Sequence, residues 1–269
     1  MGAEAGEPLS AAERMTVAAA RLLENGAVCF VGIGLPSKAA NLARATHAPD
    51  LVLIYEAGAI GAKPSVLPLS IGDGELATTA DTVVSTPEIF RYWLQGGRID
   101  VGFLGAAQID RFANLNTTVI GPYDNPKVRL PGAGGAPEIA AHAGEVFLML
   151  TQSKRSFVER LDFVTTVGFL DGGDARARRG IAGRGPTAVV TDLGVLRPDP
   201  ETKELILTEI HPGVTVAQVV AQTGWPLRVD PALRLTAAPE PQELAALREL
   251  EARSARAHGR AVSEGGGAP

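Results

Sequence analysis

The sequence predicts an α/β fold, in which a mainly parallel sheet carries helices on both faces and a helical tail follows at the C-terminus. Three apolar runs have the length and continuity of strands buried on both faces: residues 27–34 (AVCFVGIG), 51–56 (LVLIYE) and 145–150 (EVFLML). Helical patterns come before and between the first two runs, and the order helix, strand, helix, strand is typical of a parallel sheet. A chain of 269 residues, 45% of them hydrophobic, is long enough for one such domain.

The first two helices have clear start signals. Ser10 and Glu13 have the spacing of a capping box, and apolar residues then recur at helical spacing until Gly26 ends the pattern. The second helix is expected to follow the strand that ends at Gly34, with Pro36 in its first turn, where a missing N–H is tolerated.

Shorter signals predict the later elements. We expect strands at residues 81–85, 101–105, 187–196 and 203–210, the last two as a hairpin or an edge pair, and helices that open at residues 86–90 and span residues 215–222.

A change of composition near residue 238 divides the chain. Residues 1–9 are expected to form a flexible N-terminus, and residues 10–237 to form the α/β domain. Residues 238–269 are expected to form a solvent-facing helix that ends in a disordered tail, EGGGAP.

The composition also argues against several classes of function. A net charge of −5 is unlike that of a nucleic-acid-binding protein, which would carry a basic patch. No apolar run approaches the roughly 20 residues that span a bilayer, and no secretory signal is present, so we expect a cytoplasmic protein without a membrane partner. The four histidines lack the spacing of a metal site. The single cysteine, Cys29, is expected to be a core residue and not a reactive thiol.

Glu56 closes the second strand and is followed by small residues at 57–61 (AGAIG). The carboxyl ends of parallel strands form the edge where open α/β sheets bind ligands. We interpret the small residues as space left for a substrate, with Lys63 the one basic residue close by in the sequence. An ionised glutamate can act as a nucleophile without any change of its pKa. The alternative is a strand-end glutamate that pairs with a base elsewhere.

A second candidate is the glycine-rich segment at residues 128–140 (VRLPGAGGAPEIA). Gly132, Gly134 and Gly135 allow the backbone to approach a ligand closely, and a helix is expected just after them. Backbone amides held in this way can stabilise the oxyanion that forms when a carboxylate attacks a thioester. The alternative is a glycine-rich loop fitted against the sheet.

Two further patterns point less clearly to a site. Gly32 and Gly34 follow a strand and open a helix, as in a dinucleotide-binding fingerprint, but Ser37 stands where the third glycine is needed. An NAD site is therefore a distant alternative. The polar stretch at residues 105–118 is expected to form hydrogen-bonded turns and not a catalytic centre.

Five segments together resemble the B (beta) subunit of the family I CoA-transferases, especially glutaconate CoA-transferase B and related 3-oxoacid enzymes. In chain order they are YEAG (55–58), GAAQIDRFANLN (105–116), VRLPGAGGAPEIA (128–140), VVTDLGV (189–195) and HPGVT (211–215). The similarity covers roughly residues 10–230. Ala113 stands where these relatives commonly carry glycine, a change that affects a turn and leaves the nucleophile in place.

The resemblance implies a ping-pong transfer of CoA from an acyl-CoA to a small carboxylic acid. Glu56 would form an acyl anhydride and then a glutamyl-CoA thioester, while Gly132, Gly134 and Gly135 would bind the oxyanion and CoA, with Gly134 the first choice. It also implies a CoA-transferase A (alpha) subunit as partner in a hetero-oligomer, with CoA as substrate and no tightly bound cofactor. An acyl-CoA hydrolase or decarboxylase of the same fold, or a non-catalytic ligand-sensing domain, remains an alternative.

Overall fold

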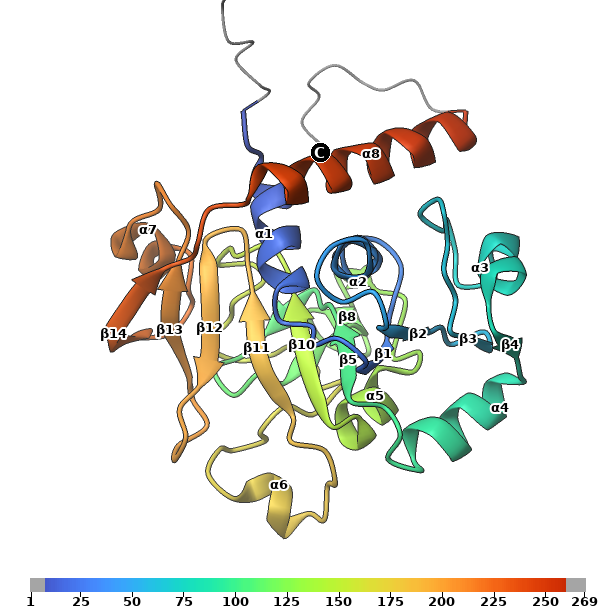
Figure 1. Cartoon of the computed structure of the whole chain (residues 1–269). Coiled ribbons are helices and arrows are strands. Elements are labelled where there is room, and N and C mark those ends of the chain that lie inside the picture. Colours follow the sequence, from blue (N-terminus) through green and yellow to red (C-terminus); the bar gives the residue numbers. More distant parts are fainter. Residues whose placement is uncertain (1–7, 260–269) are drawn as a thin grey trace, which may run out of the picture.

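The chain folds around a ten-stranded sheet with helices on both faces, in a computed structural model that describes residues 8–259 (Figure 1). The five central strands are parallel neighbours, in the spatial order β2 (Val52–Ile54), β1 (Val28–Phe30), β5 (Val101–Leu104), β10 (Glu145–Met149) and β11 (Pro186–Val190). The sheet continues past β2 through β3 (Ala59–Ile60) and β4 (Thr82–Val83), and past β11 through β12 (Gly194–Pro198), β13 (Leu205–Ile210) and β14 (Arg228–Leu235). The predicted α/β class with a mainly parallel sheet is confirmed.

Two apolar cores lie on opposite faces of this sheet. One is formed with α1 (Ala11–Ala20), α2 (Leu35–Ala45) and α8 (Pro241–Ala257), and the other with α5 (Ala136–His142) and the π-helical turn η1 (Ile89–Leu94), which follows the exposed α4 (Thr86–Glu88). The remaining elements are α3 (Gly74–Thr79), α6 (Ala175–Arg178), α7 (Val216–Ala221) and two small sheets, β6 (Gln108–Ile109) with β7 (Leu115–Asn116) and β8 (Val119–Ile120) with β9 (Val128–Arg129).

The helix starts lie where the start signals predicted them. The Ser10 hydroxyl accepts the N–H of Glu13 at 3.1 Å, and the Glu13 carboxylate accepts the N–H of Ser10 at 2.7 Å, so the predicted capping box is confirmed. Pro36 lies in the first turn of α2, as expected. No helix within residues 8–259 is long and apolar enough to cross a membrane.

Two strand predictions need correction. Residues 187–196 are not one strand, because the Thr191 hydroxyl accepts the N–H groups of Leu193 and Gly194 and so closes a turn between β11 and β12. The strand expected at residues 81–85 shrinks to the exposed two-residue β4. In addition, β14 lies on the edge of the sheet beside β13, and no pattern in the sequence indicated it.

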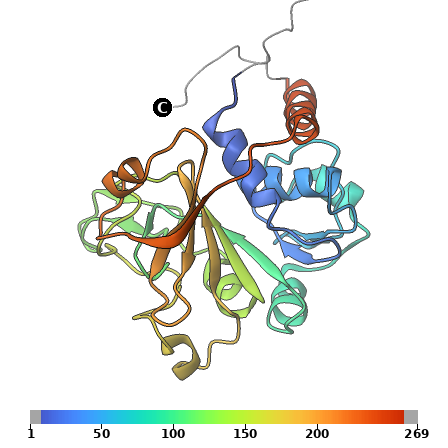
Figure 2. The same cartoon turned by 60° about the vertical axis from the view of Figure 1, so that its left-hand side comes forward.

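The C-terminal helix α8 exists and its outer face is exposed, as predicted, but its inner face packs on the domain. Figure 1 shows α8 crossing α1 and running above α2, and Figure 2 shows the same helix nearly end-on. It buries Leu247 and Leu250 against the domain. Three ion pairs fasten it: Glu243 with Arg21 of the segment after α1, Arg248 with Glu13 of α1, and Lys38 of α2 with Glu251. The predicted disordered last six residues, and most of the flexible N-terminus, lie outside the described residues.

Candidate active site

Glu56 lies in a tight turn just past the carboxyl end of β2. The Gly58 N–H donates to the Tyr55 carbonyl at 2.9 Å, which closes a β-turn with Glu56 in its second position. Tyr55 is fully buried, and its hydroxyl lies 3.3 Å from the Ser37 Oγ of α2; burial raises the pKa of the phenol. The buried tyrosine therefore anchors the turn from which the half-buried Glu56 projects.

The turn borders a cavity of about 400 Å³ at the carboxyl ends of the parallel strands. The cavity is lined by residues from the ends of β1, β5 and β10, from the first turn of α2, and from the loop that leads into α5. Glu56, Gly134 and Gly135 all line it, although they are about 80 positions apart in the sequence. The structure therefore brings two of the three predicted glycines to the predicted carboxylate.

Gly135 lies close to the Glu56 carboxylate. A Cβ atom placed on Gly135 would lie 3.3 Å from Glu56 Oε1 and 2.7 Å from Cζ of Phe90. Gly135 therefore has room for its Cα hydrogen but not for a methyl group unless its neighbours move. Neither Gly134 nor Gly135 donates its N–H to another residue in the described part of the chain, so neither amide has a protein partner there.

Gly132 has a different place in the loop. Its N–H donates to the Thr117 carbonyl at 2.9 Å, and its own carbonyl accepts the Thr117 hydroxyl at 2.8 Å. It does not line the cavity. Its φ of 103° lies in the left-handed region that favours glycine. Gly132 therefore holds the loop through its hydrogen bonds to Thr117, whereas Gly134 and Gly135 line the cavity beside Glu56.

The space beside Glu56 is not where the small residues of AGAIG suggested. A Cβ on Gly58 would lie 1.9 Å from the Val84 carbonyl oxygen, and one on Gly61 would lie 2.2 Å from a carboxylate oxygen of Asp81. The segment after α3 therefore fills that side, and our interpretation of these residues as substrate space is wrong. The open side lies across the cavity at Gly32, where a Cβ would meet nothing within 4 Å.

The Glu56 carboxylate forms no hydrogen bond or ion pair with any other described residue. Lys63, the basic residue close by in the sequence, instead bonds Asp81 at 2.5 Å on the exposed surface. A half-buried acid without a partner, beside free backbone amides, suits a nucleophile better than a structural ion pair.

Two residues near Glu56 were missed from the sequence. Phe90 of η1 packs its ring edge against Phe30, with ring centroids 6.0 Å apart, and so holds the wall beside Gly135. Ile71, in the loop between β3 and α3, lines the cavity mouth and is 40% exposed. The irregular turn of η1 could not be recognised from sequence, and an isoleucine in a loop carries no signal.

The other sequence candidates are structural. Asp110 accepts the N–H groups of Phe112 and Asn114, and Ala113 between them adopts a φ of 57°, which explains why glycine suits that turn. Cys29 is fully buried, and burial raises the pKa of its thiol, so the core interpretation is confirmed.

His211 is a buried residue that joins two parts of the sheet. It is 1% exposed, with Nδ1 2.8 Å from the Thr236 hydroxyl and Nε2 2.9 Å from the Thr191 carbonyl, so it joins the β11–β12 turn to the end of β14. Burial lowers the pKa of the ring. Within residues 8–259, no group of three or more His, Cys, Asp or Glu side chains is placed to hold a metal ion.

Comparison with known proteins decides the family. Residues 12–222 match the family model described as Coenzyme A transferase. The chain belongs to the coenzyme A transferase family. It is 67% identical to the B subunit of 3-oxoadipate CoA-transferase from Pseudomonas knackmussii, over 94% of this chain and 97% of that protein.

Two further comparisons agree. The chain is 36% identical to the B subunit of glutaconate CoA-transferase from Acidaminococcus fermentans, over 88% of this chain and 90% of that protein. The crystal structure of glutaconate CoA-transferase from the same organism superposes with a TM-score of 0.84 at 33% identity, covering 90% of this chain and 94% of that chain. The chain is thus a B-type subunit of a CoA-transferase, as the five sequence segments predicted.

Proposed function

We propose that this chain carries the nucleophile of an enzyme that exchanges CoA between a small 3-oxo dicarboxylic acid, such as 3-oxoadipate, and a second carboxylic acid. The substrate class is supported by the 67% identity to the B subunit of a 3-oxoadipate CoA-transferase. The observation that carries the chemistry is the unpaired Glu56 carboxylate beside the free amides of Gly134 and Gly135.

In the proposed first half-reaction, Glu56 attacks the thioester carbonyl of the acyl-CoA. The oxyanion of the tetrahedral intermediate accepts hydrogen bonds from the Gly134 and Gly135 amides, and the C–S bond breaks to give an acyl-glutamyl anhydride and CoA thiolate. The thiolate then attacks the Glu56 carbonyl, which releases the first acid as a carboxylate and leaves a glutamyl-CoA thioester. The acceptor acid reverses these steps, so each half-reaction balances without a proton or a redox cofactor.

A partner A subunit is part of this proposal, because the relatives are named as B subunits. We propose that the partner covers the Glu56 cavity in a hetero-oligomer and completes the acid-binding site. We also propose that the enzyme is cytoplasmic, that CoA is a substrate, and that no cofactor is tightly bound.

Trapping of the enzyme intermediate tests the proposal. The purified A/B complex is mixed with 3-oxoadipyl-CoA without acceptor and treated with borohydride or hydroxylamine, and the modified residue is located by mass spectrometry. We expect modification at Glu56, and in Glu56→Ala we expect loss of transfer by a factor on the order of 10⁴ or more, with unfolding unchanged. A fully active complex with unmodified Glu56 would rule out the mechanism, and CoA release that never needs an acceptor acid would indicate a hydrolase.

A further inference from the structure

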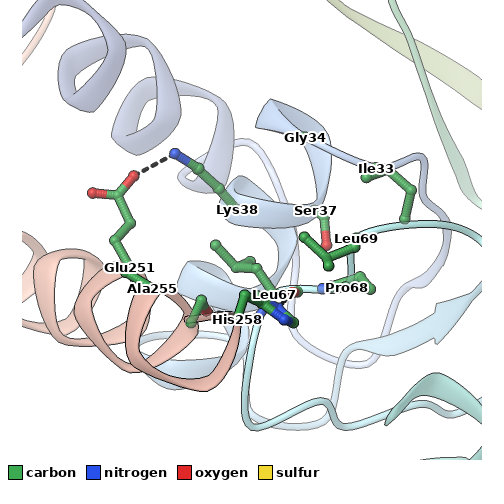
Figure 3. A pocket seen from close by; sticks show the side chains of 11 residues that line it. Ile33, Gly34, Ser37, Lys38, Leu67, Pro68, Leu69, Glu251, Ala255 and His258 are labelled. Atoms are coloured by element: carbon green, nitrogen blue, oxygen red, sulfur yellow. Dashed lines mark hydrogen bonds and ion pairs between the residues drawn. The ribbon is translucent and has the colours of Figure 1, made fainter. Parts of the chain in front are cut away.

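The loop between β3 and α3 (residues 61–73) is bonded to the C-terminal part of α8 at Leu67, while Ser65 nearer its start is bonded to Glu75 of α3. The N–H of Leu67 donates to Ser254 Oγ at 2.7 Å, and Nε2 of His258 donates to the Leu67 carbonyl at 3.0 Å. Figure 3 shows Leu67 beside His258 at the end of this helix. In the described part of the chain, residues 67–72 make no other hydrogen bond to a distant element, since Leu69, Ser70 and Asp73 bond one another.

A cavity of about 390 Å³ separates the loop from α2. Leu67, Pro68 and Leu69 line one side of it, and Ser37 and Lys38 of α2 line another (Figure 3). The ion pair between Lys38 and Glu251, drawn as a dashed line, joins α2 to α8 at 2.5 Å. Pro68 is buried while Leu69 is exposed beside this cavity, so the two hydrogen bonds at Leu67 act together with the packing of Pro68 to fix this part of the loop.

The same loop reaches the nucleophile. Ile71, four residues beyond Leu67, lines the cavity that holds Glu56, whereas Leu69 lines the cavity against α8. Both side chains are exposed in this chain, Ile71 by 40% and Leu69 by 55%. The position of an apolar side chain at the mouth of the active-site cavity thus depends on a helix at the other end of the sequence.

We propose that Ile71 shields the glutamyl-CoA thioester from water, and that Ser254 and His258 are positioning residues that hold Ile71 there through Leu67. This inference rests on the proposed function. In the side reaction, a water oxygen attacks the Glu56 thioester carbonyl, the C–S bond breaks, and Glu56 carboxylate, CoA thiol and one proton are released. An apolar side chain at the cavity mouth suppresses this reaction without slowing attack by a bound acid.

The experiment measures how the intermediate divides between transfer and hydrolysis. The A/B complex receives 3-oxoadipyl-CoA and an acceptor acid, and free thiol is measured against newly formed acyl-CoA. We expect Ile71→Ala to raise the ratio of hydrolysis to transfer at least about fivefold, equivalent to about 1 kcal/mol in relative barrier height. Ser254→Ala and His258→Ala should raise the ratio in the same direction. Leu69→Ala in the same loop and Arg256→Ala on α8 are matched controls, for which the ratio should stay at the wild-type value.

Each outcome has a separate meaning. An unchanged ratio in Ile71→Ala, or an equal rise in Leu69→Ala, would overturn the shielding role. A rise in Ile71→Ala without one in Ser254→Ala or His258→Ala would overturn the positioning role of α8. Borohydride trapping of the wild-type complex separates these results from failure of the proposed function, since unmodified Glu56 would refute the covalent mechanism itself.

Discussion

Substitution of Gly135 by alanine probes the contact between the nucleophile and the glycine loop. Gly135 has φ −81° and ψ −3°, so an alanine backbone is unstrained there, and any effect comes from the added methyl group. That methyl would lie 2.7 Å from Cζ and 3.1 Å from Cε1 of Phe90, and 3.3 Å from Glu56 Oε1. The ring cannot simply turn away, because it packs edge-on against Phe30.

Overpacking of this kind destabilises proteins by about 1–3 kcal/mol. If the loop moves to relieve it, the oxyanion amides move too, and loss of one such donor lowers the turnover rate by roughly 10²- to 10³-fold. We therefore expect Gly135→Ala to lower the transfer rate of the A/B complex within that range, and to lower the free energy of unfolding in urea by about 1–3 kcal/mol. Gly32→Ala is the control for stability alone, because its methyl would touch nothing within 4 Å.

A double mutant identifies the source of the effect. Phe90→Leu removes the ring atoms nearest to the new methyl, so Phe90→Leu/Gly135→Ala should be more stable than the two single changes predict, by at least about 0.5 kcal/mol. Wild-type transfer and stability in Gly135→Ala, or an equal loss of stability in Gly32→Ala, would refute this account of the loop.

Two further predictions concern stability. Gly58→Ala should lower the free energy of unfolding in urea by about 3 kcal/mol or more, because φ is +117° and the methyl would lie 1.9 Å from the Val84 carbonyl oxygen. Gly26→Ala is the control for backbone strain alone, because its φ is +81° and its surroundings are open. Equal losses of stability in the two variants would contradict the predicted clash. Because burial lowers the pKa of His211 from 6.5, the unfolded chain binds its proton at higher pH than the folded chain does. The free energy of unfolding should therefore fall as the pH drops below about 6.5, and His211→Gln, which cannot titrate, should lose this part of the pH dependence; identical slopes for both proteins between about pH 5 and 7 would argue against it.

Local patterns were enough to predict the central strands, most of the helices and the family. Apolar runs such as residues 51–56 and the capping box at Ser10 depend on nearby residues, so a single sequence reveals them. The β11–β12 turn was missed because Thr191, Asp192 and Gly194, which interrupt the apolar residues, were assigned to one long strand; the Thr191 hydroxyl accepts the main-chain N–H groups that close the turn. The edge strand β14 was missed because it is mostly exposed and contains Pro231.

The sequence indicated the separate segments of the candidate site, but it did not indicate which residues surround them. Glu56 and the glycine loop could be found separately, because a carboxylate at a strand end and a glycine cluster before a helix each carry a local signal. Val84 fills the space beside the Glu56 turn, and Phe90 borders Gly135. Tertiary packing places the segments that carry these two residues, so local sequence patterns do not reveal them. For the same reason α8 looked solvated, since its charged residues find their partners in α1 and α2 more than 200 positions away.

The attachment of α8 also has a consequence for biosynthesis. Glu13, Arg21 and Leu67 emerge early from the ribosome, but the α8 side chains that bond them follow 187 to 235 positions later. A nascent chain can therefore assemble its sheet while the loop beside the nucleophile is still without its two hydrogen bonds to α8. The ordering of this loop therefore waits until the last turn of α8 has left the ribosome.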